Sequence, residues 1–446
     1  MEFNQLVELM RKAGAVGTGG AGFPSYAKLN KTADTIILNC AECEPLFRVH
    51  RQLLRQHAYE IMQTLREIAE TVGAQSVIIA VKRSYTQTVE AVKEHLDEFP
   101  NMRISYLPEF YPVGDEIITV YETTGRVVNP GSIPISVGCI VYNVETVYNI
   151  WRAWKENAPV THKYITVTGE VQNPCTLHVP IGITYGELIK MVVGTTCKDP
   201  VIIAGGPMTG RISSVSDVVT KTSNAILVMP RDAYIVQKRL TPVSIDLKRA
   251  AAACCHCNMC TDLCSRNLLG HPIDPAKVMR ATSFGLPADT QAFMSVFSCS
   301  SCGLCEMYSC GQGLNPRSII AATKAELQKN GVTPPKGLVS KGANGARPYR
   351  TVPMSRLIAR LGLKKYDVDA PLIDVKIPSK KLKVMLSQGI GAPAKVAVSV
   401  GDTVKAGDVI AEYVSDKLSV STHAPMDGCV REINEKYVLL DVSAKH

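Results

Sequence analysis

The first 155 residues alternate between short apolar runs and longer stretches in which apolar positions recur every three or four residues. Phe3, Leu6, Val7 and Met10 have the spacing of one helix face, which predicts a short amphipathic helix at the start of the chain. Runs such as Ile36-Ile37-Leu38 read as buried strands. The alternation of strands and helices indicates an α/β layer architecture. The elements predicted here are helices at 3–13, 50–71 and 85–99 and strands at 35–39, 76–81 and 137–143.

The rest of the chain changes pattern several times. An alternating strand at 164–171, a helix at 184–191 and an apolar run at 201–208 form a second small unit. The segment after residue 330 is rich in Gly, Pro and Lys, as linkers are. Short strands separated by Gly-Asp turns then predict a small β-sandwich. The predicted units are therefore 1–155, 160–235, 244–330 and 380–446, with a linker at 331–379.

Two runs of four cysteines lie in the third unit. Two-residue spacers let one tight loop present three thiolates to a four-iron cube, and a fourth thiolate comes from further away. This spacing predicts two [4Fe–4S] clusters, although Ser265 and Gly311 stand where ferredoxin runs usually have proline. The last cysteine of each run either stays with its own run or is exchanged, as in two-cluster ferredoxins. The predicted ligands are Cys254, Cys257, Cys260 and Cys264 in the first run and Cys299, Cys302, Cys305 and Cys310 in the second.

Zinc and disulfides explain these cysteines less well. Structural zinc prefers two C-x2-C pairs separated by a longer loop. The N-terminus lacks a basic segment followed by an apolar core, so nothing predicts export to a compartment where disulfides form. The longest apolar runs are strand-sized and well below the ~18 residues of a membrane helix. We therefore expect a cytoplasmic protein without a transmembrane segment.

The chain carries a net charge of +9, which indicates a basic surface or an acidic ligand such as a nucleotide. No nucleic-acid recognition motif accompanies this charge, so we do not expect nucleic-acid binding. A glycine-rich loop at 17–22 leaves backbone N–H groups free to approach a phosphate. Two carboxylates, Glu42 and Glu44, follow the strand at 35–39, where the edge of an α/β sheet often binds ligands.

These motifs together resemble a known family. The segments Gly-x-Gly-Gly-Ala-Gly-Phe-Pro with Lys28, Asn39-x-x-Glu42-x-Glu44-Pro45, Gly114-x-Glu116 and Asn143-Val144-Glu145-Thr146 are similar to the flavoprotein subunit of respiratory complex I. They are closer still to the RnfC component of Rnf electron-transport complexes. Thr18 and Ala41 depart from the complex I pattern, which has arginine and an acidic residue at these positions.

The resemblance implies binding of FMN and NADH at these segments. The residues implied to surround the flavin and its phosphate are Gly17, Gly19, Gly20, Gly22, Lys28, Asn39, Glu42, Gly114 and Asn143. The residues implied to contact NADH are Phe23, which would stack on it, and the catalytic pair Glu44 and Glu116.

The other units also resemble modules of this family. Residues 163–230 resemble the soluble-ligand-binding β-grasp module, and because no convergent polar site is visible in them, we interpret the module as a spacer that docks the cluster domain. The C-terminal unit resembles the lipoyl and biotinyl barrel-sandwich domain. Lys417 has the hairpin position at which lipoyl domains are modified, but Ser415 replaces the usual Glu, which favours an unmodified structural module.

The resemblance therefore implies a multidomain α/β fold: a flavin- and NADH-binding α/β domain, a β-grasp module, a two-cluster ferredoxin-like helical domain and a C-terminal β barrel-sandwich domain. The C-terminal position of the last domain is similar to the cobalamin reductase family of propanediol-utilisation microcompartments. The function implied is oxidation of NADH through FMN and two [4Fe–4S] clusters to reduce a corrinoid.

The partners implied by this family are an adenosyltransferase and microcompartment shell proteins. Three alternatives stay open from the sequence. One is an Rnf-type NADH-oxidising subunit of a membrane complex, and another is a non-enzymatic docking protein that carries clusters. The third is a reductase of another microcompartment whose acceptor is not B12.

Overall fold

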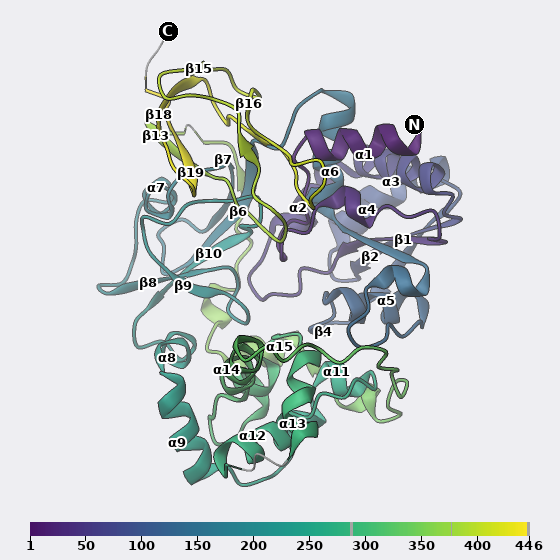
Figure 1. Ribbon diagram of the computed structural model, residues 1–446, viewed down its shortest axis with the longest axis vertical. Coiled ribbons are helices and arrows are strands. Elements are labelled where there is room, and N and C mark those ends of the chain that lie inside the picture. The colour runs from purple at the N-terminus through teal and green to yellow at the C-terminus, as the bar shows by residue number, and fades with distance from the viewer. Residues whose placement is uncertain (286–288, 376, 444–446) are drawn as a thin grey trace.

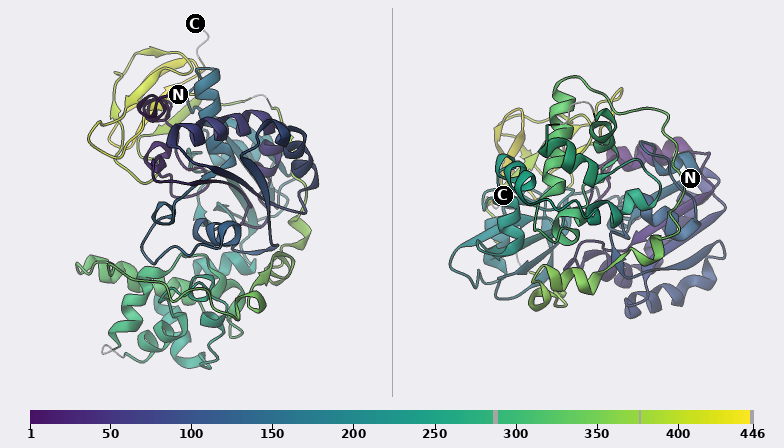
Figure 2. Two further views of the ribbon diagram at one scale, coloured as in Figure 1. Left: turned by 90° about the vertical axis from the view of Figure 1, so that its right-hand side faces the viewer. Right: turned by 90° about the horizontal axis from the view of Figure 1, so that it is seen from below.

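The computed structural model describes residues 1–285, 289–375 and 377–443. Three lobes are visible in Figure 1: an α/β domain at the upper right, a β-rich module at the left with the yellow C-terminal domain above it, and a helical domain below them. Figure 2 shows that the N-terminal helix lies beside the C-terminal domain, and Arg11 of this helix donates to the Val414 and Lys417 carbonyls. The multidomain fold predicted from the sequence is confirmed.

The α/β domain is built on a four-stranded parallel sheet in the order β3-β2-β1-β5. Alternate residues of each strand face opposite sides. In β1, Ile36 and Leu38 belong to a core that includes α1, α2 and α3, whereas Ile37 packs with Ile117 and Ile118 of α5 on the other face. A strand buried on both faces explains the uninterrupted apolar runs in the sequence.

The elements of this domain are α1 (Phe3–Lys12), β1 (Thr35–Cys40), α2 (Val49–Gln56), α3 (Ala58–Val72), β2 (Ser76–Lys82), α4 (Thr86–His95), β3 (Met102–Leu107), β4 (Phe110–Tyr111), α5 (Glu116–Thr124), β5 (Cys139–Asn143) and α6 (Val144–Lys155).

The prediction of one helix over 50–71 was wrong at its centre. The structure has α2 and α3, separated by His57, whose φ of −130° and ψ of 37° lie outside the helical region. The His57 ring stacks on Tyr148 of α6 with the ring centroids 4.1 Å apart. The helical spacing of apolar residues continues through both helices, so the sequence pattern does not show the one non-helical residue that separates them.

The β-grasp module forms a six-stranded mixed sheet in the order β12-β7-β6-β10-β8-β9. Its last strand in sequence, β12 (Leu372–Ile373), comes from the segment predicted to be a linker and pairs with β7. The module's other elements are β6 (His162–Gly169), β7 (Cys175–Pro180), α7 (Tyr185–Met191), β8 (Pro200–Ala204), β9 (Arg211–Ser213), β10 (Ala225–Pro230) and α8 (Tyr234–Leu240).

The predicted linker at 331–379 is therefore more than a tether. Its short strand β11 (Val352–Pro353) pairs with β4 of the α/β domain, and α15 (Met354–Arg360) follows at once. The segment fastens the helical domain to both neighbouring units.

The helical domain carries the cysteine runs in loops between short helices. Its helices are α9 (Val243–Ala253), α10 (Met259–Asp262), α11 (Ser265–Leu268), α12 (Pro275–Ser283), α13 (Thr290–Ser295) and α14 (Pro316–Lys329).

The C-terminal domain consists of two small sheets, β13-β19-β18-β15 and β14-β16-β17, as the Gly-Asp turns predicted. Its strands are β13 (Lys381–Met385), β14 (Lys395–Val396), β15 (Thr403–Val404), β16 (Val409–Glu412), β17 (Thr422–His423), β18 (Gly428–Ile433) and β19 (Tyr437–Asp441). The last three residues of the predicted domain lie outside the described part of the chain.

A buried ion pair joins the α/β domain to the β-grasp module. Lys163 of β6 donates to the carboxylate of Glu145 in the first turn of α6, and both side chains are 0% exposed. Lys163 Nζ also donates to Asn224 Oδ1 at 2.8 Å, and Glu145 accepts from the Tyr164 N–H at 3.1 Å. Burial raises the pKa of Glu145 and lowers that of Lys163, and each group offsets this effect in the other. The two domains are therefore coupled through one desolvated pair.

Replacing Lys163→Met removes the only cation that the described residues place on the Glu145 carboxylate. We expect the free energy of unfolding to fall by about 3 kcal/mol, because a buried charge is left uncompensated. The double variant Glu145→Leu/Lys163→Met removes both charges and should recover most of this loss. Urea unfolding followed by fluorescence checks both; a double variant as unstable as the single one would contradict the argument.

Candidate functional site

The main cavity lies at the carboxyl ends of β1 and β5. These strands are neighbours in the parallel sheet, with Asn39 paired in register with Asn143. The connection from β1 leads to β2 on one side, whereas β5 is added on the other side, so this edge is a topological switch point. Ligands of open α/β sheets bind at such points.

The cavity has a volume of about 470 Å³, within the usual range for cofactor sites. All twelve residues that the sequence assigned to flavin, nucleotide or catalysis line it. These residues are Gly17, Gly19, Gly20, Gly22, Phe23, Lys28, Asn39, Glu42, Glu44, Gly114, Glu116 and Asn143. Their individual roles stay predictions.

The glycine-rich loop forms one wall and is held in place by hydrogen bonds to its ends. The Gly17 N–H donates to the Phe23 carbonyl at 2.8 Å, and Asn143 Nδ2 donates to the Thr18 carbonyl. The Thr18 N–H donates to Thr146 Oγ1 of α6 at 3.1 Å. With both ends fixed, the middle of the loop is exposed toward the cavity, where its backbone N–H groups suit a phosphate.

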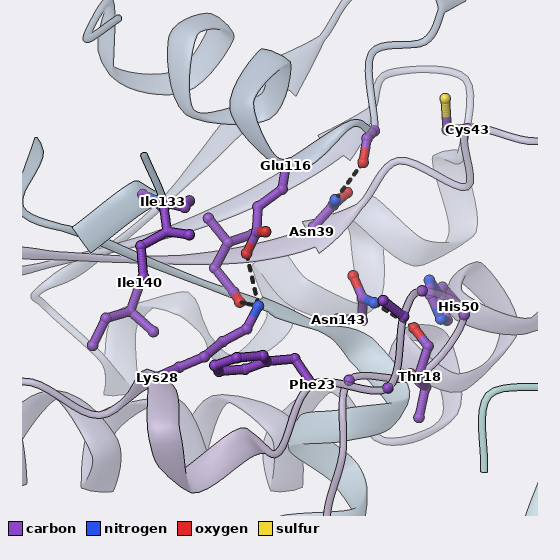
Figure 3. A pocket seen from close by; sticks show the side chains of 18 of the residues that line it. Thr18, Phe23, Lys28, Asn39, Cys43, His50, Glu116, Ile133, Ile140 and Asn143 are labelled. Atoms are coloured by element: carbon purple, nitrogen blue, oxygen red, sulfur yellow. Dashed lines mark hydrogen bonds and ion pairs between the residues drawn. The ribbon is translucent and has the colours of Figure 1, made fainter. Parts of the chain in front are cut away.

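Lys28 and Glu116 form an ion pair in the wall of the cavity (Figure 3). Lys28 Nζ lies 2.7 Å from Glu116 Oε1 and donates to the Val141 carbonyl of β5 at 2.8 Å. Glu116 is the first residue of α5, where a carboxylate interacts favourably with the helix dipole. Phe23 lies beside the Lys28 side chain, so an aromatic face and a cation–carboxylate pair share one part of the wall.

Asn39 and Gly114 meet at the end of β1. Asn39 Nδ2 donates to the Gly114 carbonyl at 2.9 Å, and Asn39 Oδ1 accepts from the Ala41 N–H at 3.1 Å. A Cβ on Gly114 would lie 2.8 Å from the Cys43 Cβ and 3.0 Å from the Ala41 Cβ. Only glycine fits this close approach, so the loop before α5 packs directly against the end of β1.

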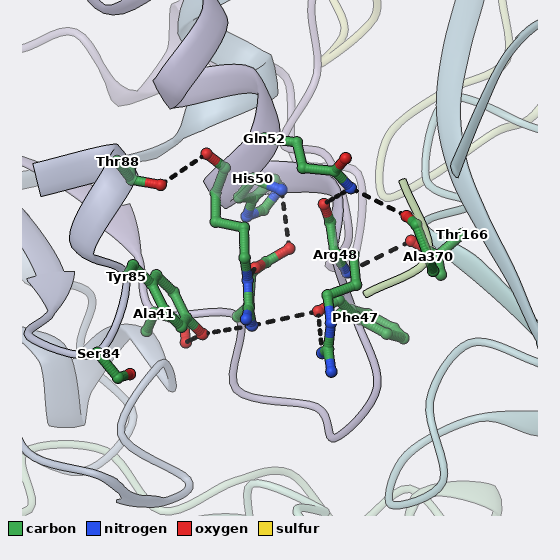
Figure 4. A network of polar contacts seen from close by, with 12 residues as sticks. Ala41, Phe47, Arg48, His50, Gln52, Ser84, Tyr85, Thr88, Thr166 and Ala370 are labelled. Atoms are coloured by element: carbon green, nitrogen blue, oxygen red, sulfur yellow. Dashed lines mark hydrogen bonds and ion pairs between the residues drawn. The ribbon is translucent and has the colours of Figure 1, made fainter. Parts of the chain in front are cut away.

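Glu42 is held as a buried anion by His50 and Arg51, and Figure 4 shows His50 and Tyr85 in the surrounding network of polar contacts. One oxygen accepts from the His50 N–H at 2.8 Å, and the other accepts from Arg51 Nε. Burial acts to raise the pKa of Glu42, but the Arg51 guanidinium and His50 outweigh it and hold this pKa below its usual range. Burial lowers the pKa of His50 to about 4, so its ring is neutral at pH 7. Glu42 thus places fixed negative charge at the cavity wall.

Glu44 reaches from the cavity to the β-grasp module. Its Oε2 accepts from the Met208 N–H at 2.8 Å, and its Oε1 accepts from the Thr209 N–H at 2.9 Å. Burial raises the pKa of Glu44, and these hydrogen bonds offset part of the effect. The carboxylate predicted to contact NADH therefore also fastens two domains together.

The sequence analysis missed Asn224, which the β-grasp module contributes to the cavity. Its Oδ1 accepts from the buried Lys163, which fixes the side chain so that Nδ2 points toward the glycine loop. A Cβ built on Gly19 would lie 1.9 Å from this Nδ2, and Gly19 has φ +72°. Asn224 follows the sequence Lys221-Thr222-Ser223, and no local motif marks it as a ligand. Only the packing of two domains brings it to the site.

The C-terminal domain also reaches the cavity. The Ile390 N–H donates to the Ala21 carbonyl of the glycine loop at 2.7 Å, and Ile390 is a lining residue with 55% of its surface exposed. A Cβ on Gly22 would lie 2.7 Å from the Gly389 Cα. The glycine loop is therefore covered by the loop at 388–391.

The eight predicted cluster ligands gather in two groups that exchange their last members. Burial raises the pKa of Cys260 to about 12, and the thiols that raise it further are Cys310, Cys254 and Cys257. The same pattern joins Cys264 to the second run, as its neighbouring thiols are Cys302 and Cys299. Cys305 has Cys299, Cys302 and Cys264 as its neighbours. Because such effects fade with distance, each group takes three cysteines from one run and the fourth from the other.

These groups fit four-iron clusters better than single ions. Both runs have the C-x2-C-x2-C spacing of four-iron clusters, whereas structural zinc prefers two C-x2-C pairs separated by a longer loop. Backbone N–H groups also point at the sulfur atoms, with Ser301 N to Cys299 Sγ and Leu314 N to Cys310 Sγ both at 3.3 Å. Such bonds stabilise thiolates and tune cluster potentials.

The group containing Cys264 and Cys302 lies near the main cavity at the ends of β1 and β5, which is called the flavin-site cavity because the sequence predicts flavin binding there. Arg266 Nη2 donates to both oxygens of Asp115 at 2.8 Å, and Asp115 also caps α5 next to the lining residue Gly114. The Tyr111 hydroxyl donates to the Cys302 carbonyl at 2.6 Å. The arrangement can therefore carry electrons between a cofactor in the cavity and the second cysteine run.

Comparison with known domain families supports this organisation. Residues 10–152 match the Nuo51 FMN-binding domain, 164–212 the SLBB domain, 253–315 the 4Fe-4S dicluster domain and 360–444 the RnfC barrel sandwich hybrid domain. A flavin-binding domain joined to an iron–sulfur domain defines the chain as an oxidoreductase, with FMN and [4Fe–4S] as its cofactors.

Relatives that match over nearly the whole chain show to which family of oxidoreductases it belongs. The cobalamin reductase PduS of Citrobacter freundii is 38% identical over 437 residues, which cover 97% of this chain and 95% of the relative. The chain therefore belongs to the family of the cobalamin reductase PduS. One component of the Na(+)-translocating ferredoxin:NAD(+) oxidoreductase complex of Acetobacterium woodii is 30% identical over 274 residues, covering 60% of this chain and 59% of that component.

Among solved structures, an NAD+-reducing [NiFe]-hydrogenase in its H2-reduced state is similar in fold. Its chain aligns with a TM-score of 0.51 at 18% identity, over 75% of this chain and 64% of the hydrogenase chain. In the described part of this chain, every helix is too short or too polar to span a membrane.

The exchange of cysteines can be tested in a variant with a single cluster. Cys254→Ser/Cys257→Ser/Cys260→Ser should keep about four irons per chain, held by the second run. Adding Cys264→Ser should lower the iron content further and change the electron paramagnetic resonance spectrum. Adding Cys310→Ser instead is the matched control and should change neither. The reverse result would mean that each run keeps its own fourth ligand.

Asn224→Asp tests the missed residue. A carboxylate beside the glycine loop should repel the FMN phosphate and weaken FMN binding roughly tenfold. Titration of flavin-depleted protein with FMN, followed by flavin fluorescence, measures the affinity. Asn173→Asp, at an exposed turn of the same module, makes the same chemical change away from the cavity. Equal affinity in both variants would remove Asn224 from the phosphate site.

Proposed function

We propose that the chain oxidises NADH at the β1–β5 cavity and passes the electrons through two [4Fe–4S] clusters to a corrinoid. A bound flavin supplies the conversion between two-electron and one-electron transfer. Three findings support this proposal: the FMN-binding domain, the two exchanged groups of thiols, and 38% identity to a protein named as a cobalamin reductase.

Different parts of the cavity wall suit FMN and NADH. The loop from Gly17 to Gly22 offers backbone N–H groups for the FMN phosphate, with Asn224 beside it. Asn39 and Gly114 bound the cavity at the end of β1, where the isoalloxazine would lie. Phe23 offers an aromatic face for stacking of the nicotinamide.

The charges in the cavity favour NADH over NADPH. The lining carries three carboxylates, Glu42, Glu44 and Glu116, and Lys28 is already paired with Glu116. A 2′-phosphate normally requires an arginine nearby, and the lining within the described residues contains none.

The observation that carries the proposal is the short connection from the cavity to the second thiol group through Asp115 and Arg266. Asp115 is adjacent to the lining residue Gly114, and both of its carboxylate oxygens accept from Arg266 Nη2. Arg266 is two residues from Cys264, which belongs to the second thiol group. A cofactor in the cavity and a cluster on this group would therefore be separated by a few bonded residues.

The electrons balance with one-electron steps at the acceptor. One NADH yields NAD+, one proton and two electrons. Two corrinoid cobalt centres each accept one electron, from Co(III) to Co(II) or from Co(II) to Co(I). Two clusters in series suit this transfer because each carries a single electron at a time.

The similarity to the Acetobacterium protein favours one alternative, in which the electrons pass to the other components of a membrane complex. Under both functions, the cavity and the cysteine groups would have the same roles. Association with an adenosyltransferase and with microcompartment shell proteins stays a prediction of the family resemblance.

Anaerobic titration of the reconstituted protein with NADH tests the proposal. We expect bleaching of the flavin absorbance near ~450 nm, followed by electron paramagnetic resonance signals of reduced clusters. Addition of cob(III)alamin should restore the flavin absorbance, with two corrinoids reduced per NADH. The same titration without NADH is the control.

Each failure would have a distinct meaning. A flavin that stays oxidised in NADH would contradict the NADH step. A flavin that NADH reduces but that corrinoid does not reoxidise would contradict the corrinoid step and favour a protein acceptor.

A further inference from the structure

A second cleft, of about 600 Å³, lies where the β-grasp module, the cysteine-rich domain and the connecting segment meet. Three segments build it: the end of β10 with the start of α8, the loop that follows Cys310, and α15 with its continuation. Its lining residues are Met229, Ala233, Tyr234, Gly311, Gln312, Gly313, Ala359, Arg360, Leu361, Gly362 and Tyr366. Small-molecule sites occur preferentially at such junctions between domains, and the volume lies in their range.

The floor of the cleft is attached to a cluster ligand. Gly311 to Gly313 follow Cys310 directly, and the Leu314 N–H donates to Cys310 Sγ at 3.3 Å. Lys238 of α8 fixes this loop, because its Nζ donates to the Leu314 carbonyl at 3.1 Å and to Asn315 Oδ1 at 2.6 Å. A molecule resting on the loop would be separated from the sulfur by only a few bonds.

Cys310 belongs to the thiol group that lies further from the flavin-site cavity. Cys254 and Cys310 pack on a core whose residues all lie between 247 and 319, inside the cysteine-rich domain. The other group makes the contacts to Asp115 and Tyr111 of the flavin domain. The second-run group therefore contacts the flavin domain, whereas the first-run group adjoins the cleft through Cys310, so the first-run group is suited to pass electrons to a molecule in the cleft.

The walls of the cleft offer a mixed surface with free polar ends. Tyr234, Gln312 and Arg360 come from three different segments, and their side-chain polar atoms make no hydrogen bond to any part of the chain that the structure describes. Leu361 and Met229 are buried apolar residues at 3% exposure each. A corrinoid presents an apolar ring face and a periphery of amides, and this combination matches the apolar walls and the free donors.

We infer that this cleft is the binding site for the corrinoid acceptor, which receives one electron at a time from a cluster on Cys254, Cys257, Cys260 and Cys310. The inference rests on the proposed function and adds the place of the final step. In that step the cluster loses one electron and the corrinoid cobalt gains it, so no bond to the protein forms or breaks. An open concave site of this size favours a small molecule over a protein surface, which usually binds through larger and flatter areas.

Ala359→Trp fills the cleft from an exposed position on α15. Equilibrium dialysis of the holoprotein with hydroxocobalamin, without NADH, should show the dissociation constant raised roughly tenfold or more. The kcat/KM for NADH-dependent cobalamin reduction should fall by the same factor. Ala325→Trp makes the same exposed helix substitution on α14, away from the cleft, and should bind cobalamin as the wild type does.

Arg360→Ala is a second variant that only shortens an exposed side chain and is compatible with folding. It should weaken cobalamin binding by about threefold or more, through loss of a charged donor. Wild-type binding in both Ala359→Trp and Arg360→Ala, or no binding by the wild-type protein, would overturn the inference. Flavin reduction by NADH in the wild type is measured separately, and its absence would contradict the proposed function while the dialysis result still decides the cleft.

Discussion

One apolar core holds the cysteine-rich domain against the FMN-binding domain, and the proposed electron path depends on it. This core takes Leu46 and Tyr111 from the α/β domain, Met208 from the β-grasp module, Leu304 and Met307 from the cysteine-rich domain, and α15 from the connecting segment. Electron transfer weakens steeply with distance, so the relative position of these units matters more than the stability of each alone. Burial of side chains from four parts of the chain fixes that position without a covalent link. Polar contacts lie at the edge of this core: Glu44 accepts from the N–H groups of residues 208 and 209, and Arg317 donates to the Met208 carbonyl. Because hydrogen bonds are directional and apolar burial is not, these contacts fix the orientation of the packed units.

The β-grasp module does more than separate its neighbours, because it contributes residues to three regions of the molecule. It supplies Asn224 to the flavin-site cavity, Met208 to the shared core, and Tyr234 to the cleft beside Cys310. A module that touches all three regions can set their spacing. Its buried lysine, Lys163, acts in this role: it neutralises Glu145 of the neighbouring domain and orients Asn224 at the same time. Because a buried charge is costly to leave unpaired, this ion pair fixes the position of the two domains relative to each other.

The helices and strands of the α/β domain were predictable because the spacing of apolar residues within each segment is enough to define it. The strand at 35–39 and the helix at 3–13 appear nearly as expected, since both are defined by apolar period alone. The helix at 50–71 was predicted as continuous and is broken at His57, a single residue that the period does not register. The segment at 331–379 has the composition of a linker, yet it contributes β11 and β12 to two different sheets. Short strands of two residues carry no pattern of their own and form only because a partner strand lies beside them.

The sequence by itself determined the chemistry of this protein: two cysteine runs with iron–sulfur spacing, a glycine-rich loop, and carboxylates after a buried strand. These features are visible because ligand spacing within a loop is a local property of the chain. The tertiary structure decided which groups meet. It placed Cys264 with Cys299, Cys302 and Cys305, a choice that the spacing left open. It also brought Asn224 to Gly19 and joined Arg266 to Asp115. Residues so far apart along the chain come together only when separate domains bury their apolar faces against one another, and no local pattern encodes that contact.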